Sequence, residues 1–220
     1  MRFIFKTSYA QDIALAKHGG HRLWYGVLLA ALALAPWWLD DYWLSQLNFV
    51  LIYGIVGLGI MLLAGFTGQF SLGHAAFLGV GAYTQAYLVT LGCPFVLALL
   101  ASAALAAAVG VLVAMPALRL KGIYLGIATL SFGFIVEEVF ARWESVTKGN
   151  SGMSVPAPTV FGVDLSAGPG FYLACLVVTV LCTIGILNLL RSPTGRAFVA
   201  IRDSEISAKS MCIHLSRYKT

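Results

Sequence analysis

The chain of 220 residues is 60% hydrophobic, and only 10% of its residues are charged. A soluble domain carries about 25% charged residues, and here no Asp, Glu, Lys or Arg occurs from Tyr42 to Leu118. Since a helix needs roughly 20 apolar residues to cross a bilayer, this stretch holds about three spans and excludes a soluble core. The net charge of +5 does not indicate nucleic-acid binding, because the basic residues flank apolar runs and form no patch.

The apolar runs predict an all-α, polytopic membrane protein with about six transmembrane helices. The mixed, partly polar stretch before the first run is long for a signal peptide, which favours an uncleaved first span. The predicted spans are 23–39, 44–66, 70–91, 94–118, 122–140 and 171–190. They divide the chain into an N-terminal segment (1–22), a transmembrane domain (23–190) and a C-terminal amphipathic segment (191–220).

The basic residues predict the orientation. With both chain ends in the cytoplasm, all of the 14 Lys and Arg residues except Arg142 and Lys148 lie on the cytoplasmic side, as the positive-inside rule expects. The segment 144–170 is rich in Gly, Pro, Ser and Thr. In this orientation the segment 144–170 is an external loop, which is either functional or a passive connection.

The segment GFTGQFSLGHAAFLGVGAYTQA, 65–86, places glycines and polar residues at membrane depth. The glycines allow either close helix packing or a broken helix that lines a cavity. Gln69, Ser71 and His74 favour a substrate pathway or gate, since clustered polar groups in a span need partners; the alternative for His74 is a bond to a neighbouring carbonyl. Thr129 either joins this pathway or bonds back to its own helix. No second ligand stands near His74 in the sequence and the four cysteines lack metal-like spacing, so we expect no metal and no cofactor.

The segment SPTGRAFVAIRDSEISAKSM, 192–211, predicts two short amphipathic helices joined at 202–204. Pro193 suits the start of the first helix, and Asp203 is placed to cap the second. Such helices either lie on lipid or dock in a partner's groove. Acidic residues interrupt the basic face and several small residues suit close contact, which favours a protein partner.

Four motifs carry a resemblance to a known family: GxxGQxSLGHAAFxxxGAY, LRLxGxYLGIATLSFG, TxGxxGM and SPTGRAFVAIRDSEISAKSM. Together they resemble the permease subunits of branched-chain amino acid ABC importers, most of all the longer, LivM-type permease. The resemblance runs from about Leu44 to Thr220, and the last motif is similar to the EAA loop by which such permeases engage their ATPase. It implies ATPase-coupling helices formed by Gly195, Arg196, Ala197, Ala200, Ile201, Asp203, Glu205 and Ala208.

The chain departs from the family pattern at three places. The family usually has Gly where Cys212 stands, and often where Lys148 stands. Cys is strained in a left-handed helix end, so either the turn differs or coupling is impaired. Family members also continue with further spans, so we expect a fragment or truncated product whose C-terminal part is incomplete after residue 220.

The resemblance implies a permease subunit of the bacterial plasma (inner) membrane. Its expected partners are a second, LivH-like permease, two cytoplasmic ATPase subunits, a periplasmic substrate-binding protein and the lipid bilayer, and it acts as a transport subunit, not an enzyme. The sequence contains no GxxxxGK[ST] phosphate loop. The expected substrate is a branched-chain or related hydrophobic amino acid. The alternatives are a related urea or amide importer, a self-contained secondary transporter or an inactive remnant, and the lack of a mid-membrane charge counts against proton coupling.

Overall fold

The computed structural model describes residues 19–117, 120, 122–155, 158–160, 163–164, 168–215 and 218. The long helices are α2 (Gly19–Trp38), α3 (Asp41–Ile60), α4 (His74–Thr90), α5 (Phe95–Ala117), α6 (Ile123–Arg142) and α8 (Pro169–Arg191). The shorter elements are the π-helix η1 (Met61–Phe66), α7 (Glu144–Thr147), the 3-10 helix η2 (Gly149–Ser151), β1 (Thr159–Val160), β2 (Val163–Asp164), α9 (Pro193–Asp203) and α10 (Glu205–Ser210). The described chain is therefore helical apart from one two-residue strand pair, which confirms the all-α prediction.

A helix forms at each of the six predicted places. Among the described residues, four helices are long and apolar enough to cross a membrane: Asp41–Phe66, Phe95–Pro116, Ile123–Arg142 and Pro169–Arg191. The apolar part of α2, Leu23–Trp38, is shorter, and α4 has 17 residues, so the count of six spans stays a prediction. The predicted start of the third span at residue 70 is wrong, because residues 67–73 are not helical and α4 begins at His74.

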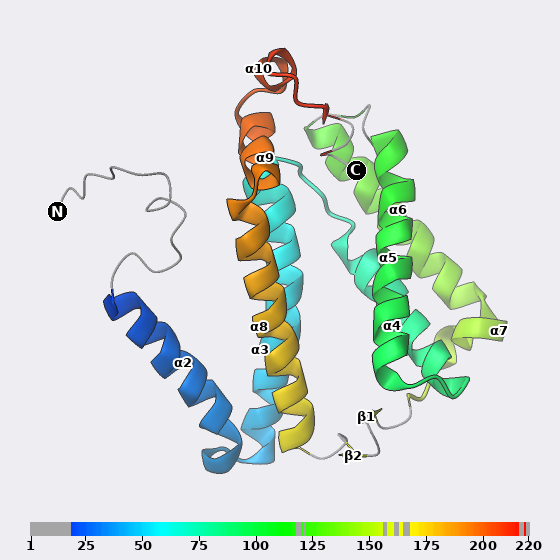
Figure 1. Cartoon of the computed structure of the whole chain (residues 1–220). Coiled ribbons are helices and arrows are strands. Elements are labelled where there is room, and N and C mark those ends of the chain that lie inside the picture. Colours follow the sequence, from blue (N-terminus) through cyan, green and yellow to red (C-terminus); the bar gives the residue numbers. More distant parts are fainter. Residues whose placement is uncertain are drawn as a thin grey trace.

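The long helices form two groups (Figure 1). One group pairs α3 with α8, and the other packs α4 against α5 and α6. One end of the molecule, here called the α9 end, holds α9, α10 and residues 67–73; the other, here called the loop end, holds α7, β1 and β2 (Figure 1). Most large apolar side chains of the spans face outward; Leu97, Leu112 and Phe134 are 61%, 69% and 62% exposed. Such a surface suits lipid as solvent and marks a multi-pass membrane protein.

Helix α2 reaches α8 through a hydrogen bond that a proline makes necessary. Pro36 lies inside α2 and has no N–H, so the carbonyl of Leu32 loses its helical partner. The hydroxyl of Tyr172 donates to this carbonyl at 2.9 Å. Tyr172 of α8 is fully buried in a core with Leu44 and Leu51 of α3. Its hydrogen bond to Leu32 therefore ties α2 to the α3–α8 pair.

Candidate functional site

The two short helices predicted near the C-terminal end of the chain form as expected, and serines cap both. The Ser192 hydroxyl accepts a hydrogen bond from the Thr194 N–H at 3.2 Å, and Pro193 begins α9. The Ser204 hydroxyl accepts from the Ser207 N–H at 3.3 Å at the start of α10. The prediction that Asp203 caps the second helix is wrong: Asp203 is the last residue of α9, and Ser204 takes the extended cap conformation.

Four residues of the predicted coupling set, all without a polar side chain, pack inside the chain. Gly195, Ala197, Ile201 and Ala208 are buried. A Cβ on Gly195 would overlap the backbone of Leu190, the penultimate residue of α8, so α9 can turn this tightly only with glycine there. These residues fix α9 on α8 and α10 on α9, and a docking partner would meet other side chains.

The outward face of α9 and α10 mixes apolar and charged side chains. Val199, Ile206 and Met211 are 40%, 84% and 75% exposed. Other exposed members of this face are Arg196, Asp203 and Lys209, while Ala200 and Glu205 are half-buried. A large apolar side chain exposed among charges at the tip of a molecule is typical of a docking surface.

Cys212 ends this segment in the left-handed conformation, with φ +62°. The turn that follows α10 is therefore the one that glycine favours, and Cys212 adopts it with the backbone strain of a non-glycine residue. Lys148, the other position where the family often has Gly, also has a positive φ, +58°.

Arg202 connects α9 to the broken stretch between α3 and α4. Its Nη1 donates to the carbonyl of Gly65 at 2.7 Å. Gly68, with φ +68°, lies against the same side chain: a Cβ there would lie 3.2 Å from the Arg202 Cγ. Arg202 is not among the predicted coupling residues, because no local pattern indicates a contact between residues 137 apart in the chain.

Residues 67–73 follow a π-helix, and neither segment has the regular hydrogen bonds of an α-helix. Residues 61–66 form η1 at the end of α3, and π-helical turns are frequent at functional sites. The Thr67 hydroxyl donates to the Leu63 carbonyl at 2.5 Å, and the Gln69 N–H donates to the same carbonyl at 3.1 Å. These bonds compensate partly for the lost helical ladder.

Thr129 on α6 holds the far side of this stretch. Its hydroxyl accepts from the Leu72 N–H at 3.0 Å and donates to the Gly126 carbonyl at 2.9 Å. The bond back to its own helix is therefore present, and the role of Thr129 in a substrate pathway stays a prediction. A Cβ on Gly73 would lie 2.5 Å from the Thr129 carbonyl oxygen. The buried Thr129 thus fixes residues 72–73 on α6.

The predicted pathway residues gather only in part. The Ser71 hydroxyl accepts from the Gly73 N–H at 3.4 Å, beside Thr129. The His74 ring lies edge-on to Phe77, with ring centroids 6.5 Å apart, and its Nδ1 is buried with no hydrogen-bond partner among the described residues. A cavity of about 580 Å³ starts at Leu72 and Gly73 and runs between α4 and α6. No group of His, Cys, Asp and Glu in the described chain could hold a metal ion.

Comparisons with known proteins fit this arrangement. Residues 42–220 match the family described as branched-chain amino acid transport system, permease component. The high-affinity branched-chain amino acid transport system permease protein LivM of Escherichia coli K12 is 35% identical over 219 residues, which cover 88% of this chain and 52% of that protein. LivM of Salmonella typhimurium LT2 is 33% identical over 220 residues, 87% of this chain and 52% of that protein. The chain thus spans about half the length of these relatives. No solved structure matches it. By its match from the start of α3 onward, this chain belongs to the permease components of branched-chain amino acid transport systems.

Proposed function

We propose that this chain is a membrane-spanning permease subunit of an ABC importer for branched-chain amino acids. A second permease, two cytoplasmic ATPase subunits and a periplasmic binding protein would complete the assembly. ATP hydrolysis would occur on the ATPases, and this chain would supply the path. Membership in this family and the similarity to the two LivM permeases support the substrate class.

In this proposal the outward face of α9 and α10 docks on an ATPase. Ile206 would enter a partner's groove with Met211 and Val199 beside it, while Arg196, Asp203 and Lys209 would set the register. The orientation is the predicted one, with the α9 end in the cytoplasm. Neither an inactive remnant nor a secondary transporter would need an Ile206 side chain that is 84% exposed.

The hydrogen bond from Arg202 to Gly65 is the observation that best supports a coupling role for α9. A displacement of α9 by the motor would pull on η1 and on residues 67–73 through this bond. The same stretch is fixed to α6 through Thr129, so a push at α9 would change the spacing between α3 and α6. Rocking of packed helix groups about such a joint is how many transporters alternate access.

Capture of the ATPase tests the docking. The complete importer is purified by a tag on this chain, and retained ATPase is quantified. Ile206→Asp should lose the ATPase, because a charge enters an apolar contact. Ser154→Asp adds the same charge to an exposed residue at the loop end and should retain it. Equal retention by both variants, or no capture by the unchanged chain, contradicts the proposal.

Uptake by the full assembly tests the pathway. Gln69→Ala and His74→Ala should reduce amino acid uptake, while ATPase capture stays intact. Unchanged transport in both variants would remove these residues, with Ser71 and Thr129, from the proposed path.

A further inference from the structure

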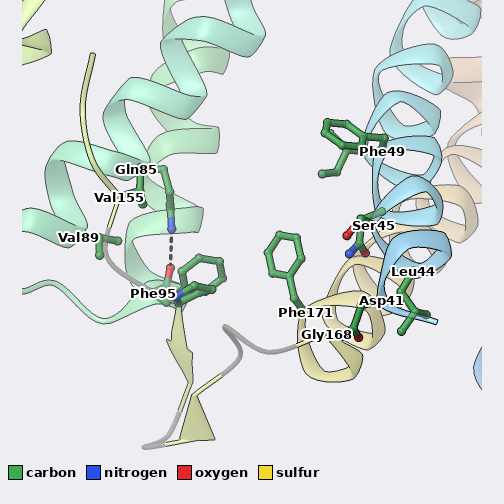
Figure 2. A pocket seen from close by; sticks show the side chains of 13 residues that line it. Asp41, Leu44, Ser45, Phe49, Gln85, Val89, Phe95, Val155, Gly168 and Phe171 are labelled. Carbon is green, nitrogen blue, oxygen red and sulfur yellow. Dashed lines mark hydrogen bonds between the residues drawn. The ribbon is translucent and has the colours of Figure 1, made fainter. Parts of the chain in front are cut away.

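A second cavity lies at the loop end, away from α9 and from the predicted pathway residues. It measures about 840 Å³ and lies between α3 and α8 on one side and α4 and α5 on the other (Figure 2). Ligand sites for small molecules have volumes of roughly 300–1,000 Å³. We call it the loop-end cavity.

One face of α3 gives this cavity a polar stripe. Asp41, Ser45 and Asn48 all line it, and their spacing of four and three residues puts them on one side of a helix. Asp41 stands in the first turn of α3, and Asn48 lies about 10 Å deeper along the helix axis. The stripe therefore runs from the mouth inward.

The acceptors of this stripe are available to a ligand. No basic side chain of the described chain forms an ion pair with Asp41. The Oδ1 of Asn48 is buried and accepts no hydrogen bond from any residue that the structure describes. A buried acceptor without a partner costs free energy, which a donor in the cavity would recover. By contrast, Gln85 on the other wall is occupied: its amide nitrogen donates to the Phe95 carbonyl at 3.3 Å, and its oxygen accepts from Ser102 at 3.4 Å.

The remaining wall is aromatic. Phe49 and Phe171 extend from α3 and α8 toward Phe95 at the start of α5 (Figure 2). Ser45 offers a hydroxyl, and α8 begins directly after the wall residue Gly168, so the N–H groups of its first turn after Pro169 have no helical acceptor. A ligand that matches this set has a cationic group, a carboxylate and an apolar body.

We infer that the loop-end cavity is a receiving site for α-amino acids with an aliphatic side chain, separate from the pathway at residues 69–74. The ammonium group binds Asp41 at the mouth and passes to the Asn48 oxygen, while the side chain lies among Phe49, Phe95 and Phe171. This inference rests on the proposed function for the direction of transport. It adds the place where the substrate first meets the permease.

Kinetics of the complete importer in proteoliposomes test the anionic contact. Asp41→Asn should raise the KM for leucine uptake about tenfold, the usual size of a lost charge-assisted hydrogen bond. Asp40→Asn is the matched control, since Asp40 is the adjacent carboxylate and does not line the cavity, and it should leave KM unchanged. Equal KM values for the two variants overturn the site. Loss of ATPase capture in the unchanged assembly would instead overturn the proposed function.

Thiol protection tests occupancy directly. Ser45→Cys, with Cys93 replaced by Ser, is labelled by a membrane-impermeant maleimide in right-side-out vesicles that contain the complete importer. Leucine should slow the labelling severalfold, and 4-methylpentanoate, which lacks the ammonium group, should not. Gln46→Cys, on another face of α3, should be labelled without protection. Labelling that leucine does not slow, or no labelling of Ser45→Cys at all, means that lipid or another helix fills the cavity and overturns the inference.

Discussion

At the scale of single residues, Tyr172 and Pro36 form a matched pair. Pro36 deprives the Leu32 carbonyl of its helical donor, and Tyr172 supplies a hydroxyl from α8. In a membrane no water replaces a missing donor, so the pair stabilises the position of α2. Neither residue alone predicts the contact, because Tyr172 and Leu32, which it joins, lie 140 positions apart.

Removal of that hydroxyl should destabilise the protein. Tyr172→Phe leaves the Leu32 carbonyl without a donor, at a cost of about 1–3 kcal/mol, and the midpoint of thermal unfolding in detergent should fall. Pro36→Ala in the same chain restores a backbone N–H to the helix and should recover most of the loss. If the double variant is as unstable as Tyr172→Phe alone, the proline does not create the need for Tyr172.

Cys212 shows strain at a single position. A non-glycine residue in the left-handed region costs roughly 1–2 kcal/mol, partly offset by the greater freedom of glycine when unfolded. Cys212→Gly should therefore stabilise the end of α10, seen as slower amide hydrogen exchange at residues 205–213. Cys212→Ser keeps the Cβ and should change nothing; the same protection in both variants would show that the thiol, not the backbone, matters.

At the scale of elements, the helices follow from composition and the breaks do not. The uninterrupted apolar run of α5 predicts its place to within a residue at each end. The start of α4 was misplaced because Phe70 and Leu72 continue the apolar pattern. The backbone there instead turns at Gly68 and is held by Arg202 and Thr129, which come from distant elements. The sequence therefore indicated a polar, glycine-rich region but not which contacts it makes.

Close approach of this stretch to α6 depends on Gly73. A Cβ at Gly73 meets the Thr129 carbonyl oxygen at 2.5 Å, and this oxygen belongs to the backbone of α6, which cannot rotate away as a side chain can. Gly73→Ala should cost about 1–3 kcal/mol as an overpacked contact and lower both the unfolding midpoint and uptake. Gly81→Ala, inside α4 and with nothing within 4 Å of its Cβ, should be neutral or stabilising. If Gly73→Ala and Gly81→Ala change the unfolding midpoint equally, residues 72–73 can move away from α6 and accommodate the added methyl group.

At the scale of the whole molecule, charge and hydropathy predicted the fold class. They could not predict the loop-end cavity, because its walls come from helices that lie far apart in the chain. They also could not predict which face of α9 points outward. The buried Ala197 and Ile201 and the exposed Val199 all fit one amphipathic pattern, and only the packing on α8 separates them.

The orientation in the membrane can be tested with cysteines that the chain already carries. Cys93 and Cys212 are both exposed; Cys93 follows α4 toward the loop end, and Cys212 follows α10 at the α9 end (Figure 1). The positive-inside rule predicts that the α9 end lies in the cytoplasm, because most Lys and Arg residues flank the predicted spans on that side in the sequence. An impermeant maleimide applied to right-side-out vesicles should therefore label the chain, and Cys93→Ser should abolish the labelling while Cys212→Ser preserves it. Inside-out vesicles should give the opposite dependence. If Cys212 is the residue labelled from outside, α9 and α10 cannot meet a cytoplasmic ATPase, and the loop-end cavity cannot receive an amino acid from the periplasm.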